Sequence, residues 1–275
     1  MKLTNKDFLI LKNFMHSNYG INLENKKTLI ETRLAMMVNR LGFRDFNSYI
    51  DNLMKDKSGE QVSLLVDKLT TNYTYFMREE MHFEFLKNYV FVPALKKLPV
   101  GGIKIWSAAS STGEEAYCTA MLAANVFGEN AKFKVSITAS DISSKVLKEA
   151  TEGIYSQDKI TKLPSVWSKN YFRKVNSKDY IVNDSIKKLV EFKYFNLNGN
   201  IGWYKNKYDV IFCRNVMIYF DNATNIMLTK KLYDSLKPGG YLIIGMSESL
   251  SNIKTDFERV KPSIYKKQIN TIITK

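Results

Sequence analysis

The first 80 residues carry apolar side chains at the three- and four-residue spacing of amphipathic helices. Four such patterns follow one another, and Gly20 and Gly42 mark the ends of the first two. The apolar positions are Phe8, Leu11, Met15 and Tyr19; Ile30, Leu34, Met37, Val38 and Leu41; Phe46, Tyr49, Ile50 and Leu53; and Val62, Leu65, Val66 and Leu69. We therefore expect residues 1–80 to form an all-helical domain.

From about Ile103 the pattern changes to short apolar runs that alternate with helical patterns. The runs expected as strands are Ile103–Ala108, Phe133–Ser140, Leu189–Asn196, Tyr208–Cys213 and Tyr241–Met246. The helices expected between them are Gly113–Phe127, Ser144–Glu152 and Asn222–Leu236. Alternating strands and helices are typical of a doubly wound parallel sheet, so residues 81–275 are predicted to form an α/β domain.

The alternation breaks between Gly153 and Lys193. Polar residues there separate two short runs that favour strands, Tyr180-Ile-Val and Leu189-Val-Glu-Phe. This pattern predicts a small antiparallel β insertion at about residues 165–193.

Composition adds the cellular setting. Hydrophobic residues make up 45% of the chain, as in ordinary globular proteins. No apolar stretch approaches the roughly 18 residues that span a bilayer, and the polar, charged N-terminus does not resemble a secretory signal. The two cysteines, Cys118 and Cys213, fall inside expected core elements and are too few for a disulfide framework. We therefore expect a cytoplasmic protein.

The net charge of +14 is concentrated after residue 80. Residues 159–207 alone hold 11 basic and 3 acidic side chains. A solvated lysine-rich face, an acidic protein partner and nucleic acid would each account for this excess.

Polar side chains follow three expected strands at the carboxyl ends where open α/β sheets bind ligands. A turn of small residues before Gly113 leads into a helix with an acidic first turn. Asp141 ends the second strand, where a carboxylate suits ribose hydroxyls, and Arg214 and Asn215 follow the fourth. Each of the first two could instead be a helix cap. Together they favour a nucleoside-cofactor site.

A segment of hydrogen-bonding and aromatic residues, 70–79, lies between the helical and α/β regions. A cleft between two domains would lie at this place. The segment contains one arginine, Arg78, which could bind a ligand or form a surface ion pair with Glu79 or Glu80.

Four motifs occur in a fixed order along the chain: Thr71-Asn-x-Thr-x-Phe-x-Arg78, Ser110-x-Thr-Gly-Glu-Glu115, Phe212-Cys-Arg-Asn-Val-Met-Ile-Tyr-Phe-Asp221 and Leu236-Lys-Pro-Gly-Gly-Tyr-Leu…Gly245-x-Ser-Glu-Ser249. With them, residues 3–267 resemble the chemotaxis receptor methyltransferase family (CheR), which esterifies receptor glutamates with S-adenosylmethionine. The resemblance implies a Rossmann-like methyltransferase domain with a small antiparallel β insertion, preceded by a receptor-facing all-α domain.

The resemblance also implies roles for individual residues. Arg78 and Tyr219 would be catalytic, with Arg78 between cofactor and substrate and Tyr219 facing the transferred methyl group. No metal is implied. Cofactor contacts are implied for Asn72, Thr74, Arg78, Glu115 (in preference to Glu114), Asp141, Asn196, Leu197, Arg214 and Asn215.

Some positions depart from the family pattern. Ala116 stands where proline is common, and Met246 where histidine is frequent. Residues 173–180 lack the glycine found in members that bind a C-terminal receptor pentapeptide. The resemblance therefore implies an enzyme that meets the cytoplasmic helices of chemotaxis receptors without that tether. We expect no nucleic-acid partner and no direct membrane insertion, and a monomer is the default expectation.

The chemistry needs few ionisable groups. A glutamate acceptor, with a reference pKa near 4.3, is ionised at neutral pH and needs no general base. The chain has two histidines: we expect His16 to be structural or exposed, and His82, in the helix after Arg78, not to contact the site. Arg33, Arg40 and Arg44 could meet the acidic receptor helices, and an exposed arginine without a partner is nearly as well supported for each of them.

Two other functional classes fit the sequence less well. A nucleic-acid amino-methyltransferase would resemble enzymes with Asp/Asn-Pro-Pro-aromatic after the fourth strand, where this chain has Arg214-Asn-Val-Met. Cys213 sits within a strand and is better interpreted as a small buried hydrophobe than as a nucleophile. A catalytically silent binding module is disfavoured because Arg78, Asp141, Asn215 and Tyr219 are all present.

Overall fold

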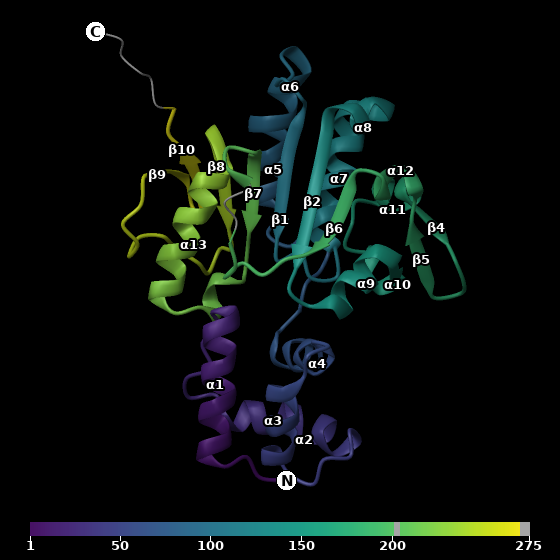
Figure 1. Cartoon of the computed structure of the whole chain (residues 1–275). Helices are drawn as coiled ribbons and strands as arrows, with labels where there is room; N and C mark the ends of the chain where they lie inside the picture. Colours follow the sequence, from purple (N-terminus) through teal and green to yellow (C-terminus); the bar gives the residue numbers. More distant parts are fainter. Residues whose placement is uncertain (201–203, 270–275) are drawn as a thin grey trace.

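The computed structural model describes residues 1–200 and 204–269. The N-terminal helices form a separate layer below an α/β body (Figure 1). These helices are α1 (Asn5–Tyr19), α2 (Lys27–Arg40), α3 (Phe46–Lys55) and α4 (Glu60–Leu69). Their predicted apolar faces pack into one core that runs from Leu3 to Leu69, which confirms the all-helical prediction.

The main sheet has seven strands in the order β6-β2-β1-β7-β8-β10-β9. The first five are parallel and the last two antiparallel, which confirms the doubly wound α/β class. Their bounds are β1 (Ile103–Ala108), β2 (Val135–Asp141), β6 (Val190–Tyr194), β7 (Tyr208–Cys213), β8 (Leu236–Ile244), β9 (Phe257–Lys261) and β10 (Ile264–Lys267).

Two apolar cores lie on the two faces of this sheet. In β7, Val210 and Phe212 belong to one core, and Ile211 and Cys213 belong to the other. All four are fully buried, as a strand covered on both faces requires. The helices of the α/β body are α5 (Met81–Leu86), η1 (Lys87–Phe91), α6 (Val92–Lys96), α7 (Glu114–Phe127), η2 (Gly128–Asn130), α8 (Ala131–Lys134), α9 (Ser144–Glu152), η4 (Met217–Tyr219) and α13 (Asn222–Ser235).

The small antiparallel sheet differs in extent from the prediction. It has the order β3 (Ile154–Ser156), β5 (Asp179–Val182) and β4 (Phe172–Lys174). It therefore begins earlier than residue 165, and Leu189-Val-Glu-Phe is not part of it, because Val190–Tyr194 pair with β2 in the main sheet. Short helices α10 (Gln157–Ile160) and α11 (Ser165–Tyr171) connect β3 to β4, and α12 (Asp184–Lys187) leads from β5 to β6 of the main sheet.

The end of α1 is joined to the start of α13. Ile21 forms an antiparallel bridge with Phe220, and the Asn22 N–H donates to the Tyr219 carbonyl at 2.8 Å. The His16 Nε2 lies 2.6 Å from an Asp221 carboxylate oxygen. These contacts fix the helical layer against the carboxyl edge of the sheet. The division into domains at residue 80 stays a prediction.

Across the described ranges, none of the helices combines the length and apolar character that a membrane crossing requires.

Candidate functional site

A pocket lies where the helical layer meets the carboxyl ends of the parallel strands. It encloses about 1040 Å³ of space, including its open mouth. Its lining combines the end of α1, the segment after α4 and the turns after β1, β2, β6 and β7. The structure brings together here every predicted site residue: Asn72, Thr74, Arg78, Glu115, Asp141, Asn196, Leu197, Arg214, Asn215 and Tyr219.

The turn after β1 bends sharply around the second strand. Ala109 and Ser111 adopt positive φ values of 78° and 50°, and Gly113 adopts 93°. This bend points the N–H groups of Ala109 and Ser110 at the Ser140 carbonyl, each at 2.8 Å. Ser110 lines the pocket, and its buried Oγ has no hydrogen-bond partner within the described residues. The turn thus contains a hydroxyl group whose hydrogen-bonding capacity is unused in the described chain.

Asp141 is held at the end of β2 by backbone donors. One carboxylate oxygen accepts the Ser111 N–H at 2.8 Å, and the other accepts the Ser143 N–H at 3.0 Å. Burial raises the pKa of Asp141, although these donors oppose the shift. The Ser143 hydroxyl, not Asp141, caps α9 by accepting the Val146 N–H. Asp141 therefore faces the pocket without serving as a helix cap.

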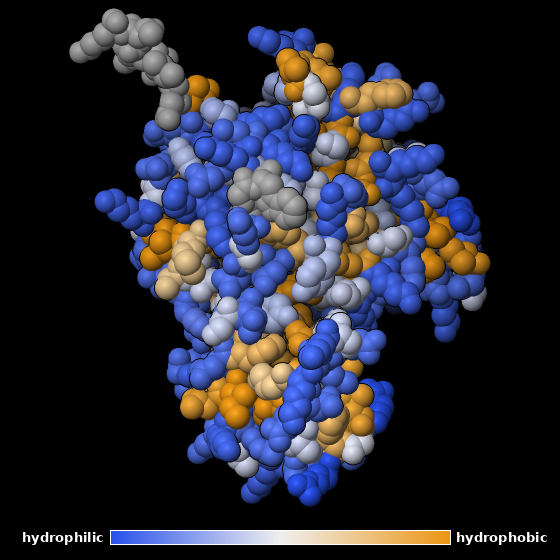
Figure 2. All heavy atoms as spheres, in the orientation of Figure 1, coloured by the Kyte–Doolittle hydropathy of each residue, from blue (hydrophilic) through white to orange (hydrophobic). Residues whose placement is uncertain are grey.

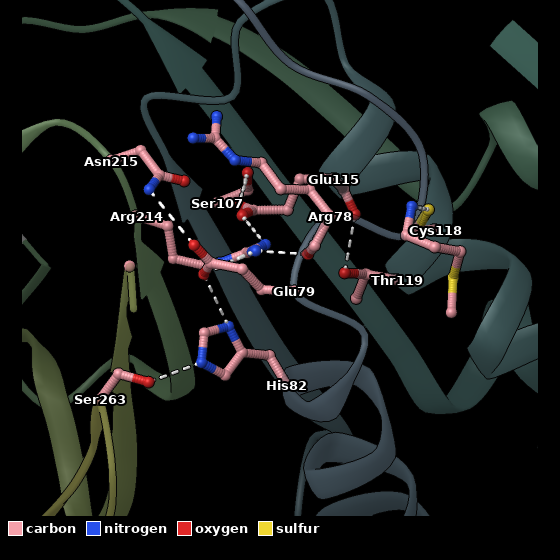
Figure 3. A network of polar contacts seen from close by, with 12 residues as sticks. Arg78, Glu79, His82, Ser107, Glu115, Cys118, Thr119, Arg214, Asn215 and Ser263 are labelled. Atoms are coloured by element: carbon pink, nitrogen blue, oxygen red, sulfur yellow. Dashed lines mark hydrogen bonds and ion pairs between the residues drawn. The ribbon is translucent and has the colours of Figure 1, made fainter. Parts of the chain in front are cut away.

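Arg214 is buried and paired with two carboxylates (Figure 3). Its Nη1 lies 2.8 Å from Glu115, and its Nη2 lies 3.0 Å from Glu79 and also donates to the Arg78 carbonyl. Glu115 accepts a further hydrogen bond from the Ser107 hydroxyl at 2.6 Å. These bonds occupy most of the N–H donors of Arg214 and fix its position relative to Glu79 and Glu115, and its contact with the cofactor stays a prediction.

Glu114 and Glu115 point in different directions. Glu114 is fully buried and pairs with Lys159 at 2.8 Å, away from the pocket. Glu115 lines the pocket. The preference for Glu115 therefore agrees with the geometry.

Glu79 is a site residue that sequence reasoning considered only as a surface partner of Arg78. It pairs with Arg214 instead, and it also accepts the Met246 N–H at 3.2 Å. Burial alone would raise the pKa of Glu79, but the charge of Arg214 and these donors hold it below its ordinary value. Only the tertiary arrangement reveals this pairing.

Arg78 has a different environment from Arg214. Its Nη1 donates to the Tyr73 carbonyl at 3.0 Å, and its guanidinium carbon lies 5.9 Å from the centre of the Tyr75 ring. Among the described residues no carboxylate lies within ion-pair distance of it. Figure 3 shows the guanidinium projecting away from the Arg214 cluster. The surface ion pair that was the alternative for Arg78 is therefore absent from the described part of the chain.

Glu248 is a second residue that sequence reasoning left without a role, although it lies in the fourth motif. Its carboxylate accepts three backbone N–H groups, from Asn215 and Met217 at 2.8 Å and from Gly245 at 2.6 Å. Burial raises the pKa of Glu248, against the effect of these donors. Glu248 thereby holds Asn215 in its left-handed conformation, with φ of 57°.

The pocket lining contains no histidine, lysine or cysteine within the residues that the structure describes. His82 is completely buried behind Glu79, and its Nε2 lies 2.7 Å from the Ser263 hydroxyl. Burial, helped by Arg214, lowers the pKa of His82 to about 4. Cys118 and Cys213 are also fully buried, and burial raises their pKa values, so both behave as small hydrophobes.

Of the arginines expected to face a receptor, Arg33 is engaged elsewhere. It donates to the carbonyls of Leu69 and Thr70 and to the Thr71 hydroxyl, because it lies under the segment that follows α4. Arg33 is therefore not an exposed arginine without a partner, and its contact with a receptor stays a prediction. Arg40 and Arg44 are exposed.

Several residues in or near the pocket lining have strained backbone conformations. Positive φ angles in residues other than glycine occur at Met77, Glu79, Ala109, Ser111 and Asn215. Such conformations cost on the order of 1–3 kcal/mol each and persist where surrounding contacts enforce them, which is common at functional sites.

Comparison with known proteins gives two family matches. Residues 72–266 match the profile described as "CheR methyltransferase, SAM binding domain", and residues 6–70 match "CheR methyltransferase, all-alpha domain". The chain belongs to the CheR methyltransferase family. It is accordingly an S-adenosylmethionine-dependent methyltransferase, and S-adenosylmethionine is its cofactor.

The sequences of known chemotaxis methyltransferases align with nearly the whole chain. The chemotaxis protein methyltransferase of Borreliella burgdorferi is 41% identical over 97% of this chain and 96% of the relative. The chemotaxis protein methyltransferase 2 of Vibrio cholerae is 33% identical over 93% and 89%, respectively. Among solved structures, a putative sarcosine dimethylglycine methyltransferase from Galdieria sulphuraria has a TM-score of 0.37 at 16% identity, over 60% of this chain and 46% of that one.

The residues present fit this cofactor. The pocket holds a buried acid at the end of β2, the unpartnered Ser110 hydroxyl at the turn after β1, and the Asn196–Leu197 segment beside them. Carboxylate and hydroxyl groups at these strand ends suit a nucleoside. The remainder of the lining holds one further carboxylate, Glu115, which is paired with Arg214.

Proposed function

We propose that the enzyme methylates the side-chain carboxylates of specific glutamates in the cytoplasmic part of chemotaxis receptors. The products would be glutamyl methyl esters and S-adenosylhomocysteine. The names of its relatives support a substrate within chemotaxis. The observation that carries the proposal is Arg78, a pocket-lining guanidinium with no carboxylate partner in the described chain.

The lining suits an acceptor that is already an anion. Bound S-adenosylmethionine supplies an electrophilic methyl group on a sulfonium centre. The described lining contains no histidine, lysine or cysteine, and its two carboxylates, Asp141 and Glu115, are already bound by backbone N–H groups and by Arg214. A glutamate acceptor is ionised near neutral pH and needs no base. Alignment and exclusion of water would then supply the rate enhancement.

Arg78 and Tyr219 are the proposed catalytic residues. Arg78 would bind one oxygen of the acceptor carboxylate by a charge-assisted hydrogen bond and leave the other oxygen free to attack. Tyr219, in η4 at the pocket wall, would line the path of the methyl group and keep water out.

The remaining predicted residues are proposed to hold the cofactor. Asp141 would accept the ribose hydroxyls, and Asn196 and Leu197 would border the adenine. Asn72, Thr74, Glu115 and Asn215 would hold the methionyl part. Arg214 would act largely through Glu115 and Glu79, which it already binds.

The receptor is proposed to approach over the helical layer, as a bundle of Glu-rich helices meeting the exposed Arg40 and Arg44. Opposite charges would speed this encounter and make it sensitive to salt. We propose that the enzyme acts in the cytoplasm as a monomer, without the pentapeptide tether and without nucleic acid.

The test is methyl transfer from radiolabelled S-adenosylmethionine to receptor-containing membranes. Arg78→Ala should lower kcat by about 10- to 100-fold, because it removes one charge-assisted hydrogen bond. Binding of S-adenosylhomocysteine, measured by calorimetry, should change less than kcat. Arg259→Ala removes an exposed arginine of β9 and is the matched control.

The label on the receptor should be released by mild base, as expected for an ester. Base-stable label, or label on added RNA instead of receptor, would overturn the proposal. An Arg78→Ala variant with unchanged kcat would refute the role of Arg78 alone.

A further inference from the structure

The amino-terminal edge of the main sheet carries exposed apolar side chains between lysines. We call this surface the apical patch. Its most exposed apolar members are Val100, at 99% exposure, and Phe133, at 74%. The full set is Val92, Leu95, Leu98, Val100 and Phe133, with Lys96, Lys97, Lys132 and Lys134. Figure 2 shows apolar spheres at this end of the molecule, over α6 and α8, with hydrophilic residues around them.

The patch is one surface although it comes from two segments. The loop before β1 lies against the residue before β2, since a Cβ on Gly102 would sit 2.8 Å from the Lys134 carbonyl oxygen. The rings of Phe91 and Phe127 are 5.5 Å apart and join η1 to the end of α7. In Figure 1 both α6 and α8 stand at the end of the body opposite the N-terminal helices.

The charged members of the patch are all lysines, and one exposed acid, Glu129, borders it next to Asn130. No aspartate or glutamate occurs from Phe85 to Gly113 or from Asn130 to Ser140. The Lys132 ammonium lies 4.8 Å from the centre of the Phe133 ring, so the lysines flank the apolar groups closely. A surface of this kind is complementary to one that is negatively charged outside and apolar beneath.

We propose that the apical patch docks the enzyme peripherally on a membrane surface rich in acidic lipids. The apolar side chains enter the boundary between head groups and acyl chains, and the lysines bind the anionic head groups. A protein partner fits less well, because lysine is depleted at protein–protein interfaces. The contact is superficial and crosses no membrane.

Docking at this edge leaves the pocket accessible. Leu98 and Val100 precede β1, and Phe133 precedes β2, whereas the pocket lies where these strands end. The patch and the pocket are therefore at opposite edges of the sheet. The inference is independent of the methyl acceptor and would stand if the proposed substrate were wrong.

The test is cosedimentation of the whole protein with lipid vesicles. We expect binding to vesicles of equal parts phosphatidylcholine and phosphatidylglycerol, weaker binding at high salt, and little binding to phosphatidylcholine alone. Lys96→Gln with Lys97→Gln should weaken binding about 25-fold, since each lysine near an anionic surface contributes about fivefold. Leu98→Ser with Val100→Ser should weaken it about tenfold by removing apolar contact.

The matched control is Val166→Ser with Lys169→Gln, which makes the same kinds of change at exposed positions of α11. It should bind vesicles as the wild type does. All variants should bind S-adenosylhomocysteine normally, which shows that they are folded. The proposal is overturned if the wild type ignores acidic vesicles, if the control loses as much binding as the patch variants, or if the patch variants lose binding to a soluble protein while vesicle binding is unchanged.

Discussion

At the scale of single residues, two arginines of the pocket show how surroundings decide a role. Arg214 is buried between Glu79 and Glu115 and keeps the turn after β7 in place. Arg78, whose carbonyl Arg214 binds, has its own guanidinium directed at a backbone carbonyl and the pocket. An arginine side chain thus holds neighbouring residues in place at position 214, whereas at position 78 it has no carboxylate partner among the described residues.

His82 should make the stability of the protein depend on pH. Its pKa is about 4 in the folded chain, below the ordinary 6.5, so between these values the unfolded chain binds a proton that the folded chain excludes. The free energy of unfolding should therefore fall as pH decreases from 6.5 to 4, by up to about 3 kcal/mol from this residue. Urea unfolding at several pH values, for the wild type and His82→Gln, measures the difference.

The control is Ser263→Ala, which removes the hydroxyl next to His82 Nε2 and keeps the titrating group. It should be less stable at every pH and keep the slope of the wild type, whereas His82→Gln should flatten it. An unchanged slope in His82→Gln would show that other groups cause the pH dependence.

At the scale of elements, the join between α1 and α13 depends on Gly20. This residue ends α1 with φ of 71°, and an added Cβ would lie 2.8 Å from the Thr224 methyl group. Gly20→Ala should lower the free energy of unfolding by about 1–3 kcal/mol, from backbone strain and the clash. It should also weaken cofactor binding, because Tyr19 and Ile21 line the pocket.

Gly42→Ala is the matched control for this prediction. Gly42 also has a positive φ, of 83°, but nothing lies within 4 Å of an added Cβ. It should lose only the part of the stability that comes from backbone strain, and it should bind cofactor normally. Equal effects of the two substitutions on thermal unfolding and calorimetric binding would contradict a role for the contact with Thr224.

The elements were predictable where the sequence carries a local signal. Tyr208–Cys213 and Ser144–Glu152 match β7 and α9, since apolar runs and caps are encoded nearby. The insertion was misplaced because Ile154–Ser156 pairs with residues more than twenty positions later, and the sequence has no local pattern for such a contact.

The strand ends and the motifs indicated the residues that line the pocket. Glu79 and Glu248 were missed because their partners come from distant segments.

At the scale of the whole molecule, residues of both the helical layer and the α/β body line the pocket. Tyr19, Ile21 and Leu69 contribute from the helical layer, and Asp141 and Asn215 from the sheet. Cofactor binding should therefore stabilise both layers together. Hydrogen exchange with and without S-adenosylhomocysteine should show slower exchange of the Gly20–Asn22 amides as well as of those following β1 and β7.

Exchange that slows only in the α/β body would contradict this coupling. The amides of α3, which lie in the helical core, should change mainly through global stabilisation and provide the internal reference.

The absence of an ordinary base from the described pocket lining also bears on how such enzymes diversify. In the proposed reaction, the site aligns a carboxylate that is already ionised in water and places no further chemical demand on its acceptor. New substrates can then be acquired by changing outlying surfaces, such as the exposed face of α2, while the pocket is inherited intact. Exchanging the N-terminal helices between relatives would be a direct route to redirecting the enzyme.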